Sequence, residues 1–259
     1  MDKNLADALE LAKRTNYTNK DIIYLKNVEI VEWDIRSAGF SVLKYKGAIP
    51  PFLIDEWEKL DKHTRSVREG NLQRANPNIA SLIINTLADV RSCFVNLNGI
   101  KDYEILSIKK DAMFLINKRI SHNKIFNDYF EFRKKGVYSS YVLLGEKEIY
   151  YSSSTNSMDI KGISEASREK CGAIIKDLVY LIRSGEKLNR EQLFPILKAY
   201  RKKYLNRELP LDCYRELNNG GKFRIGKYTL EEIDESMRDD IDISGNFMNY
   251  INPIINILV

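Results

Sequence analysis

Cysteine and histidine are both scarce in this chain of 259 residues. The three cysteines, Cys93, Cys171 and Cys213, lie far apart and form neither a Cys-x-x-Cys pair nor a zinc-ligand spacing. We therefore expect reduced thiols rather than a disulfide framework or a zinc centre. Only two histidines, His63 and His122, are present, which disfavours histidine-based metal sites and Ser-His-Asp catalysis.

Long hydrophobic runs are also missing, because no apolar run approaches the roughly 18 residues that a membrane-spanning helix needs. The first residues, MDKNLADALELAKR, mix acids and bases, unlike a signal or transit peptide. We therefore expect a protein of the cytoplasm (the host cytoplasm if a phage encodes it) with no membrane partner. The composition, 44% hydrophobic and 30% charged, is that of an ordinary globular protein. The net charge of +5 permits a nucleic-acid partner without requiring one.

The periodicity of apolar residues predicts strands and helices in alternation up to about residue 164. A short alternating strand is predicted at 27–35, and two hairpins are predicted to turn at Lys109-Lys110-Asp111 and at Gly145-Glu146. Helices are predicted at residues 3–14, 41–47, 52–67 and 79–99, with a breaker-rich loop at 69–78. Beyond residue 164 strand patterns nearly disappear and helices dominate. The sequence therefore predicts an α+β fold with a domain boundary near residue 164.

Two aspartates stand at the ends of predicted strands. Asp34 closes the strand at 27–35, and Asp111 lies in the turn of the first hairpin. Two carboxylates from neighbouring strand ends can hold a pair of divalent cations about 4 Å apart, as phosphoryl transfer requires. Mg²⁺ (or Mn²⁺) suits such oxygen ligands. The alternative is that both acids are ordinary strand-end and turn residues.

Small residues follow the first of these aspartates. At Ser37-Ala38-Gly39, backbone N–H groups without large side chains can approach a triphosphate closely. The clustered bases Lys62, Arg65 and Arg68 are the candidates for holding the same triphosphate. Their alternative role is that of a solvated helix face.

Four segments resemble the palm of family B DNA polymerases, in a minimal, phage-type form. DIRSAGF (34–40) resembles motif A, and YEILSIKKDAMFLI (103–116) resembles the motif C hairpin, with Asp111 at its second, metal-binding Asp. The helix predicted before that hairpin occupies the position of the family's helix leading into motif C. RKKGVY (133–138) and MDIKGI (158–163) are similar to the family's Lys-Lys-x-Tyr segment and later Lys-Gly step.

The resemblance implies a metal-dependent nucleotidyltransferase, a minimal DNA or RNA polymerase or primase. It implies an antiparallel palm-like sheet with helices on one face over residues 1–163, a fingers-like insertion near 47–78 and a mainly helical thumb-like region over 164–259. Asp34 and Asp111 would be the catalytic residues and the ligands of two metal ions. Nucleoside triphosphates would be the substrates, and a primer-template or single strand the partner. The residues implied to contact the nucleic-acid backbone are Lys134, Lys135, Tyr138 and Lys161.

The sequence departs from the family pattern at motif C, where Lys109 stands at the position of the first Asp. This departure favours an alternative, a non-catalytic descendant of the palm that binds nucleic acid or protein. A second alternative is a reverse-transcriptase-like polymerase, since DIRSAGFSV also resembles that family's motif A. Reverse transcriptases, however, carry paired acids in motif C, and here Lys110 precedes Asp111.

Two further features bear on substrates. Gly39 lies five positions after Asp34, where palm polymerases commonly hold a bulky residue under the incoming sugar. Its lack of a side chain predicts weak discrimination between ribo- and deoxynucleotides; its alternative role is a turn residue chosen for backbone freedom. In a thumb-like domain, Arg201-Lys202-Lys203 would follow a nucleic-acid backbone through phosphate contacts; the alternative is a solvated helix face.

Overall fold

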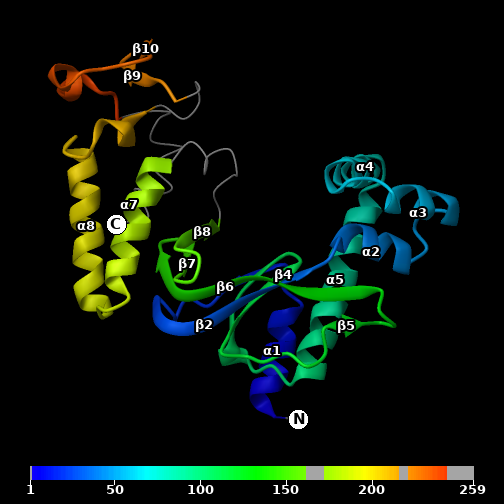
Figure 1. Ribbon diagram of the computed structural model, residues 1–259. Coiled ribbons are helices and arrows are strands. Elements are labelled where there is room, and N and C mark those ends of the chain that lie inside the picture. The colour runs from blue at the N-terminus through cyan, green and yellow to red at the C-terminus, as the bar shows by residue number, and fades with distance from the viewer. Residues whose placement is uncertain (1, 162–171, 216–220, 244–259) are drawn as a thin grey trace. The chain divides into compact units, whose positions relative to one another are not determined.

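The computed structural model describes residues 2–161, 172–215 and 221–243, and these form an α+β fold, as the sequence predicts. Two compact units are present (Figure 1). The first contains residues 1–19 and 29–137, and the second contains residues 20–28 and 138–259. The predicted boundary near residue 164 lies outside the described residues. The compact units divide at 137/138, inside a strand.

The first unit is built from a sheet and five α-helices. Its strands follow the order β1-β3-β4-β2-β6, with β5 paired to β6. The helices are α1 (Lys3–Ala12), α2 (Ala38–Tyr45), α3 (Pro51–Glu58), α4 (Lys62–Ala75) and α5 (Pro77–Asn98), with a 3₁₀ turn η1 (Asp102–Glu104). The strands are β1 (Asn16–Thr18), β2 (Tyr24–Ile35), β3 (Ile105–Lys109), β4 (Ala112–Ile116), β5 (Lys124–Ile125) and β6 (Phe130–Leu144). Strands β2 and β6 each continue into the second unit.

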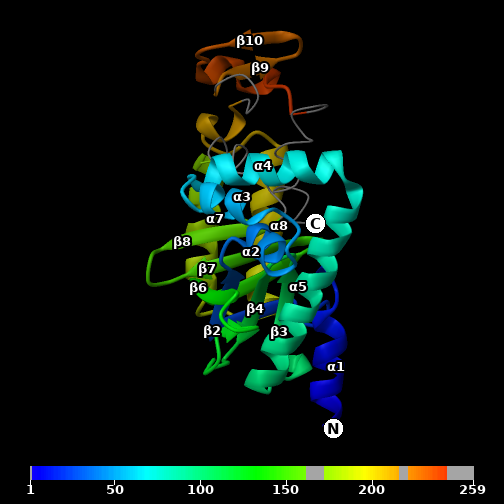
Figure 2. The same ribbon diagram turned by 90° about the vertical axis from the view of Figure 1, so that its right-hand side faces the viewer.

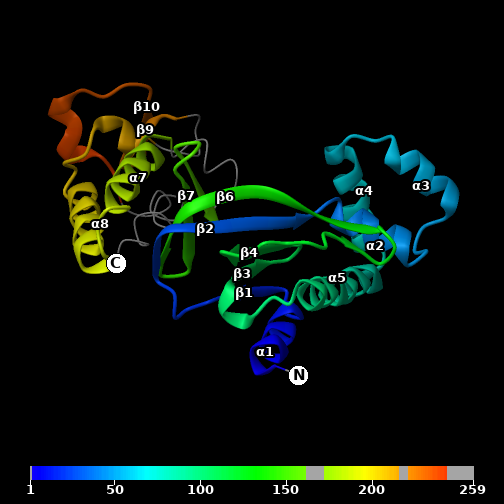
Figure 3. The same ribbon diagram turned by 60° about the horizontal axis from the view of Figure 1, so that its bottom comes forward.

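Helices α1 and α5 pack on one face of this sheet (Figures 1 and 3). The core between them contains Ile35 from β2, Met113 from β4 and Phe94 from α5, all at most 1% exposed. Phe94 stacks on Phe132 of β6 with 3.8 Å between ring centroids. Alternation along each strand therefore turns the neighbouring residues, among them Asp34, toward the opposite face.

The segment at 47–78, predicted as a fingers-like insertion, forms α3 and α4. The continuous helix predicted at 52–67 is wrong, because the chain breaks at residues 59–61 and Asp61 caps α4 by accepting the N–H of Thr64 at 3.0 Å. The loop predicted at 69–78 is also wrong, since α4 runs to Ala75. Asn76 alone is extended, and Pro77 begins α5. The Asn76-Pro77 step confines the break between α4 and α5 to one residue. Helix α4 crosses the start of α5 (Figure 2).

The second unit contains a three-strand meander and a helical hairpin. Strand β6 pairs antiparallel with β7 (Lys147–Ser152), which pairs antiparallel with β8 (Ser157–Lys161), as the hairpin predicted at Gly145-Glu146 requires. Helices α7 (Gly172–Gly185) and α8 (Arg190–Leu205) share its core with the sheet. The remaining elements are η2 (Leu211–Tyr214), β9 (Phe223–Ile225), β10 (Tyr228–Leu230) and η3 (Glu235–Asp240). No helix within the described ranges has the length and hydropathy needed to cross a membrane.

Replacing Phe94 by alanine should lower the free energy of unfolding by about 3–5 kcal/mol, because it removes a fully buried ring and leaves a cavity against Phe132. Denaturant unfolding followed by circular dichroism measures the change. Leu97→Ala is the matched control, since Leu97 lies on the same helix and is 46% exposed. Its effect should stay within about 0.5 kcal/mol. Equal losses in the two variants would contradict the assignment of the core face.

Candidate active site

The two aspartates predicted as metal ligands lie at adjoining ends of paired strands. In the antiparallel pair β2–β4, Asp34 is opposite Ala112, and the N–H of Ile35 donates to the carbonyl of Asp111 at 3.1 Å. Asp111 itself occupies the two-residue turn between β3 and β4, where Lys110 adopts a left-handed φ of 55°. The sheet therefore brings together two carboxylates that are 77 positions apart in the sequence (111 − 34 = 77).

A buried arginine fixes the turn that carries Asp111. The side chain of Arg91, from α5, is 1% exposed, and its guanidinium donates to the carbonyl of Lys110 in that turn. It also donates to the carbonyls of Ala12 at 2.9 Å and Arg14 at 3.0 Å, at the end of α1. Burial lowers the pKa of Arg91 to about 10, while the negative charge of Asp111 opposes that shift. Arg91 thus remains a cation beneath the acidic pair.

A third carboxylate, Glu32, lies two residues before Asp34 on the same strand and therefore on the same face. It is 2% exposed. The ammonium of Lys135, from β6, lies 3.4 Å from Oε1 of Glu32 and 3.9 Å from Oδ2 of Asp34. The face opposite the α1–α5 core thus holds a cluster of charges at the end of β2.

The electrostatics of this cluster favour added positive charge. Burial raises the pKa of Asp34, and the negative charges of Asp111 and Glu32 raise it further, against the opposing positive charges of Lys135 and Lys62. Burial tends to lower the pKa of Lys135, but the charges of Glu32 and Asp34 outweigh that effect, so that its pKa is raised. Asp34 and Asp111 therefore repel each other, and a cation between their oxygens would relieve that repulsion.

The residues present fit a divalent cation as a pair of carboxylates. Asp34 and Asp111 supply hard oxygen donors of the kind Mg²⁺ prefers, and a two-carboxylate site leaves coordination positions for water and phosphate. In the part of the chain that the structure describes, no group of three or more His, Cys, Asp or Glu residues is arranged to hold a metal ion.

The small residues after Asp34 lead into α2. Ser37 precedes the helix in a left-handed conformation, with φ 47°, and its side chain makes no capping hydrogen bond. Gly39 lies inside the helix, and a Cβ there would clash with the carboxylate of Glu69 from α4. The alternative role of Gly39 as a turn residue is wrong, because its backbone is helical. A role beneath a sugar stays a prediction.

One of the three predicted triphosphate-binding bases reaches the small-residue segment. Nη1 of Arg65 donates to Oγ of Ser37 at 3.3 Å, and its guanidinium lies over the ring of Phe40. Ser37, Phe40 and Arg65 line a cleft of about 720 Å³. Lys62 acts on Asp34 through its charge. Arg68 is held by an ion pair with Glu56.

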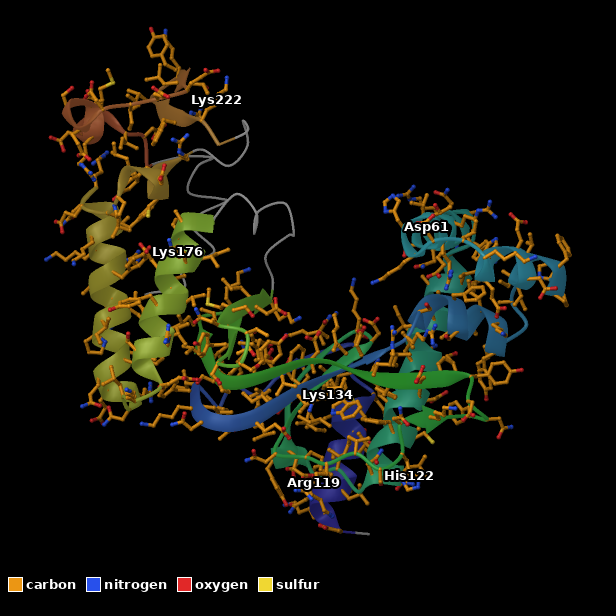
Figure 4. All side chains as sticks on the ribbon, viewed as in Figure 1. Asp61, Arg119, His122, Lys134, Lys176 and Lys222 are labelled. Atoms are coloured by element: carbon orange, nitrogen blue, oxygen red, sulfur yellow. The ribbon has the colours of Figure 1, made fainter. Side chains whose placement is uncertain are left out.

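The predicted backbone-contacting residues fall into two separate groups. Lys134 lies on β6 (Figure 4), with its ammonium 4.0 Å from Oε2 of Glu29. Lys135 joins the acidic cluster, as described. In the second unit, the hydroxyl of Tyr138 donates to Oδ2 of Asp159 at 3.3 Å, and Lys161 pairs with the same carboxylate at 2.6 Å.

Sequence reasoning missed Glu32 and the ion pair that it forms. The signal for Glu32 was its alternation with Asp34 on a half-buried strand, which places both acids on one face. No local signal could identify its partner, because the contact depends on β6, about a hundred residues later in the chain.

Comparison with known proteins places the chain in a phage family. The family model described as Bacteriophage PBS1 gene 130 protein matches residues 8–259, and the chain therefore belongs to this family. A search of the curated proteins finds no match to the chain.

Replacing Asp34 by asparagine should stabilise the protein at pH 7 by about 1 kcal/mol, because it removes a charge that burial and the neighbouring acids disfavour. Because folding raises the pKa of Asp34, folding favours its protonated form. The stability of the parent protein should thus be highest, relative to the variant, below the unfolded-state pKa of about 3.9. It should fall as pH rises through the folded-state pKa. Denaturant unfolding between pH 3 and pH 7 measures the difference in unfolding free energy between the parent and the variant.

The control for this measurement is Glu29→Gln, which removes an exposed carboxylate from the same strand. If the difference in unfolding free energy between the parent and Asp34→Asn does not widen as pH rises, the raised pKa of Asp34 is contradicted.

Proposed function

We propose that this chain is a palm-type, metal-dependent nucleotidyltransferase that adds nucleotides to a nucleic-acid strand. One observation carries the proposal: Asp34 and the turn that holds Asp111 lie at adjoining ends of paired antiparallel strands, close enough for the charge of Asp111 to act on Asp34. Two-metal phosphoryl transfer uses a pair of neighbouring carboxylates of this kind. The motif resemblance supports the same reading.

The residues of the chain have separable tasks in this proposal. Asp34 and Asp111 would hold Mg²⁺ or Mn²⁺, which when bound activates the attacking oxygen and stabilises the leaving oxygen. Arg65, fixed by hydrogen bonds to the carbonyls of Trp57 at 3.1 Å and Leu60 at 2.8 Å, offers a positioned guanidinium for phosphate. Lys62 adds a second positive charge near Asp34. Arg91 holds the Asp111 turn in place and touches no substrate.

The test is nucleotide incorporation on primed DNA and RNA templates, with ribo- or deoxynucleotides and with Mg²⁺ or Mn²⁺. Asp34→Asn and Asp111→Asn should each reduce incorporation at least about a hundredfold, since each removes charge that stabilises the transition state. Glu10→Gln, which alters an exposed acid paired with Lys13 on α1, should retain activity. A folded parent that incorporates neither sugar on either template would refute the proposal. The template and sugar arms also separate DNA-polymerase-like from reverse-transcriptase-like or primase activity.

A second candidate, a palm-derived protein that binds nucleic acid without catalysis, is favoured by three observations. Lys135 already supplies a positive charge against Asp34, and Lys109 stands beside Ala112 where a further acid would strengthen a metal site. The second unit adds a basic helix, α8. Its exposed lysines Lys198, Lys202 and Lys203 make no ion pair with any residue in the described ranges.

Replacing both Lys202 and Lys203 by methionine should weaken single-stranded DNA binding and reduce the slope of log affinity against log salt by about 1.4, or about 0.7 per lost phosphate contact. Fluorescence anisotropy over a salt series measures both quantities. Lys222→Met is the matched control, because Lys222 on the neighbouring hairpin is engaged by Glu231 at 2.9 Å. An unchanged slope in the double variant would exclude α8 from the nucleic-acid interface.

A further inference from the structure

The ion pair between β2 and β6 has one buried end and one exposed end. Glu32 is 2% exposed and fixed within the sheet, whereas the side chain of Lys135 is 55% exposed. Asp34, with a side chain 21% exposed, lies between these extremes. The side chain of Lys135 can therefore move away into solvent, whereas the carboxylates of Glu32 and Asp34 are held in place.

The ammonium of Lys135 lies where a metal ion bound by the carboxylates of Glu32 and Asp34 would lie. It lies within 4 Å of a carboxylate oxygen of both Glu32 and Asp34, which are hard donors suited to Mg²⁺ or Mn²⁺. A buried carboxylate requires a counter-charge, and in the absence of metal Lys135 provides it. The ammonium and a metal ion would need the same oxygens of Glu32 and Asp34, so they exclude each other there.

We propose that Lys135 and a divalent cation compete for the carboxylates of Glu32 and Asp34. The lysine is the resident counter-ion of these two carboxylates, and the metal replaces it there. This inference rests on the proposed function for the existence of the metal site, and adds a residue that holds the site until metal arrives.

The neighbouring lysine provides a matched control. Lys134 lies one residue earlier on β6, carries the same charge, and pairs with Glu29 at 4.0 Å, with both side chains about half exposed. A variant at Lys134 therefore changes the net charge equally without touching the acidic cluster.

The first experiment measures Mn²⁺ binding to the full chain by isothermal titration calorimetry. Lys135→Met should bind Mn²⁺ about tenfold more tightly than the parent, because it removes the competing charge. Lys135→Arg, which keeps a cation, should remain close to the parent, and Lys134→Met should change affinity less than twofold. Equal or weaker binding by Lys135→Met would overturn the inference.

The second experiment uses the parent protein and so does not depend on the folding of a variant. Amine acetylation, read by mass spectrometry, reports how available each lysine is. Adding Mg²⁺ should increase labelling of Lys135 several-fold relative to an equal ionic strength of sodium chloride, while labelling of Lys134 stays constant. Unchanged labelling of Lys135 at a saturating Mg²⁺ concentration would overturn the inference.

The failures of the two proposals are distinguishable. If the parent incorporates nucleotides but neither Lys135 experiment shows competition, the inference fails and the proposed function stands. If Lys135→Met binds Mn²⁺ more tightly but no variant incorporates nucleotides, the competition stands and the enzymatic proposal fails. Absence of Mn²⁺ binding in the parent and in every variant would overturn both.

Discussion

The guanidinium of Arg91 is the interaction on which the first unit depends. It leaves the middle of α5, passes into the protein interior and donates to three backbone carbonyls, two at the end of α1 and one in the β3–β4 turn. A buried cation that satisfies three carbonyls is costly to lose, because each carbonyl would be left without a partner. Arg91 thereby fixes α1, α5 and the β3–β4 hairpin relative to one another, and the turn that carries Asp111 is placed beside the end of β2.

From this arrangement the charge distribution of the site follows. The β2–β4 pairing places Asp34 beside the Asp111 turn, and strand alternation places Glu32 on the same face. Three acids near one another are stable only with cations around them, and the chain supplies Arg91 beneath, Lys135 across the sheet and Lys62 from α4. The rise in the pKa of Asp34 shows that its charged form is not fully stabilised. Such incomplete compensation is common where a protein binds an ion or transfers a proton.

Much of this framework could be predicted from sequence because its signals are local. Apolar periodicity predicts α5, and turn residues predict both hairpins, including the position of Asp111 in its turn. The limits of α4 could not be predicted, because Gly70 and the Asn residues around it suggest a loop, whereas the Asn76-Pro77 step alone ends the helix. The missing side chain of Gly39 suggested an open space beside its Cα, but the carboxylate of Glu69 occupies that space. The contact of Lys135 with Glu32 depends on which distant strands pair, and no local pattern contains that information.

Strands β2 and β6 each pass from one compact unit into the other, and this has a consequence for dissecting the chain. Residues 20–28 belong to the second unit although residues 1–19 and 29–137 belong to the first. Within the second unit the carbonyl of Ile23 accepts the N–H of Leu143 at 2.8 Å, and the hydroxyl of Tyr24 donates to the carbonyl of Gly185 at 2.5 Å. No single cut of the polypeptide therefore releases either unit intact, and a truncation at 137/138 would strip the second unit of an edge it needs. The chain passes between the two units three times, at 19/20, 28/29 and 137/138, so neither unit corresponds to one uninterrupted segment that could be expressed by itself.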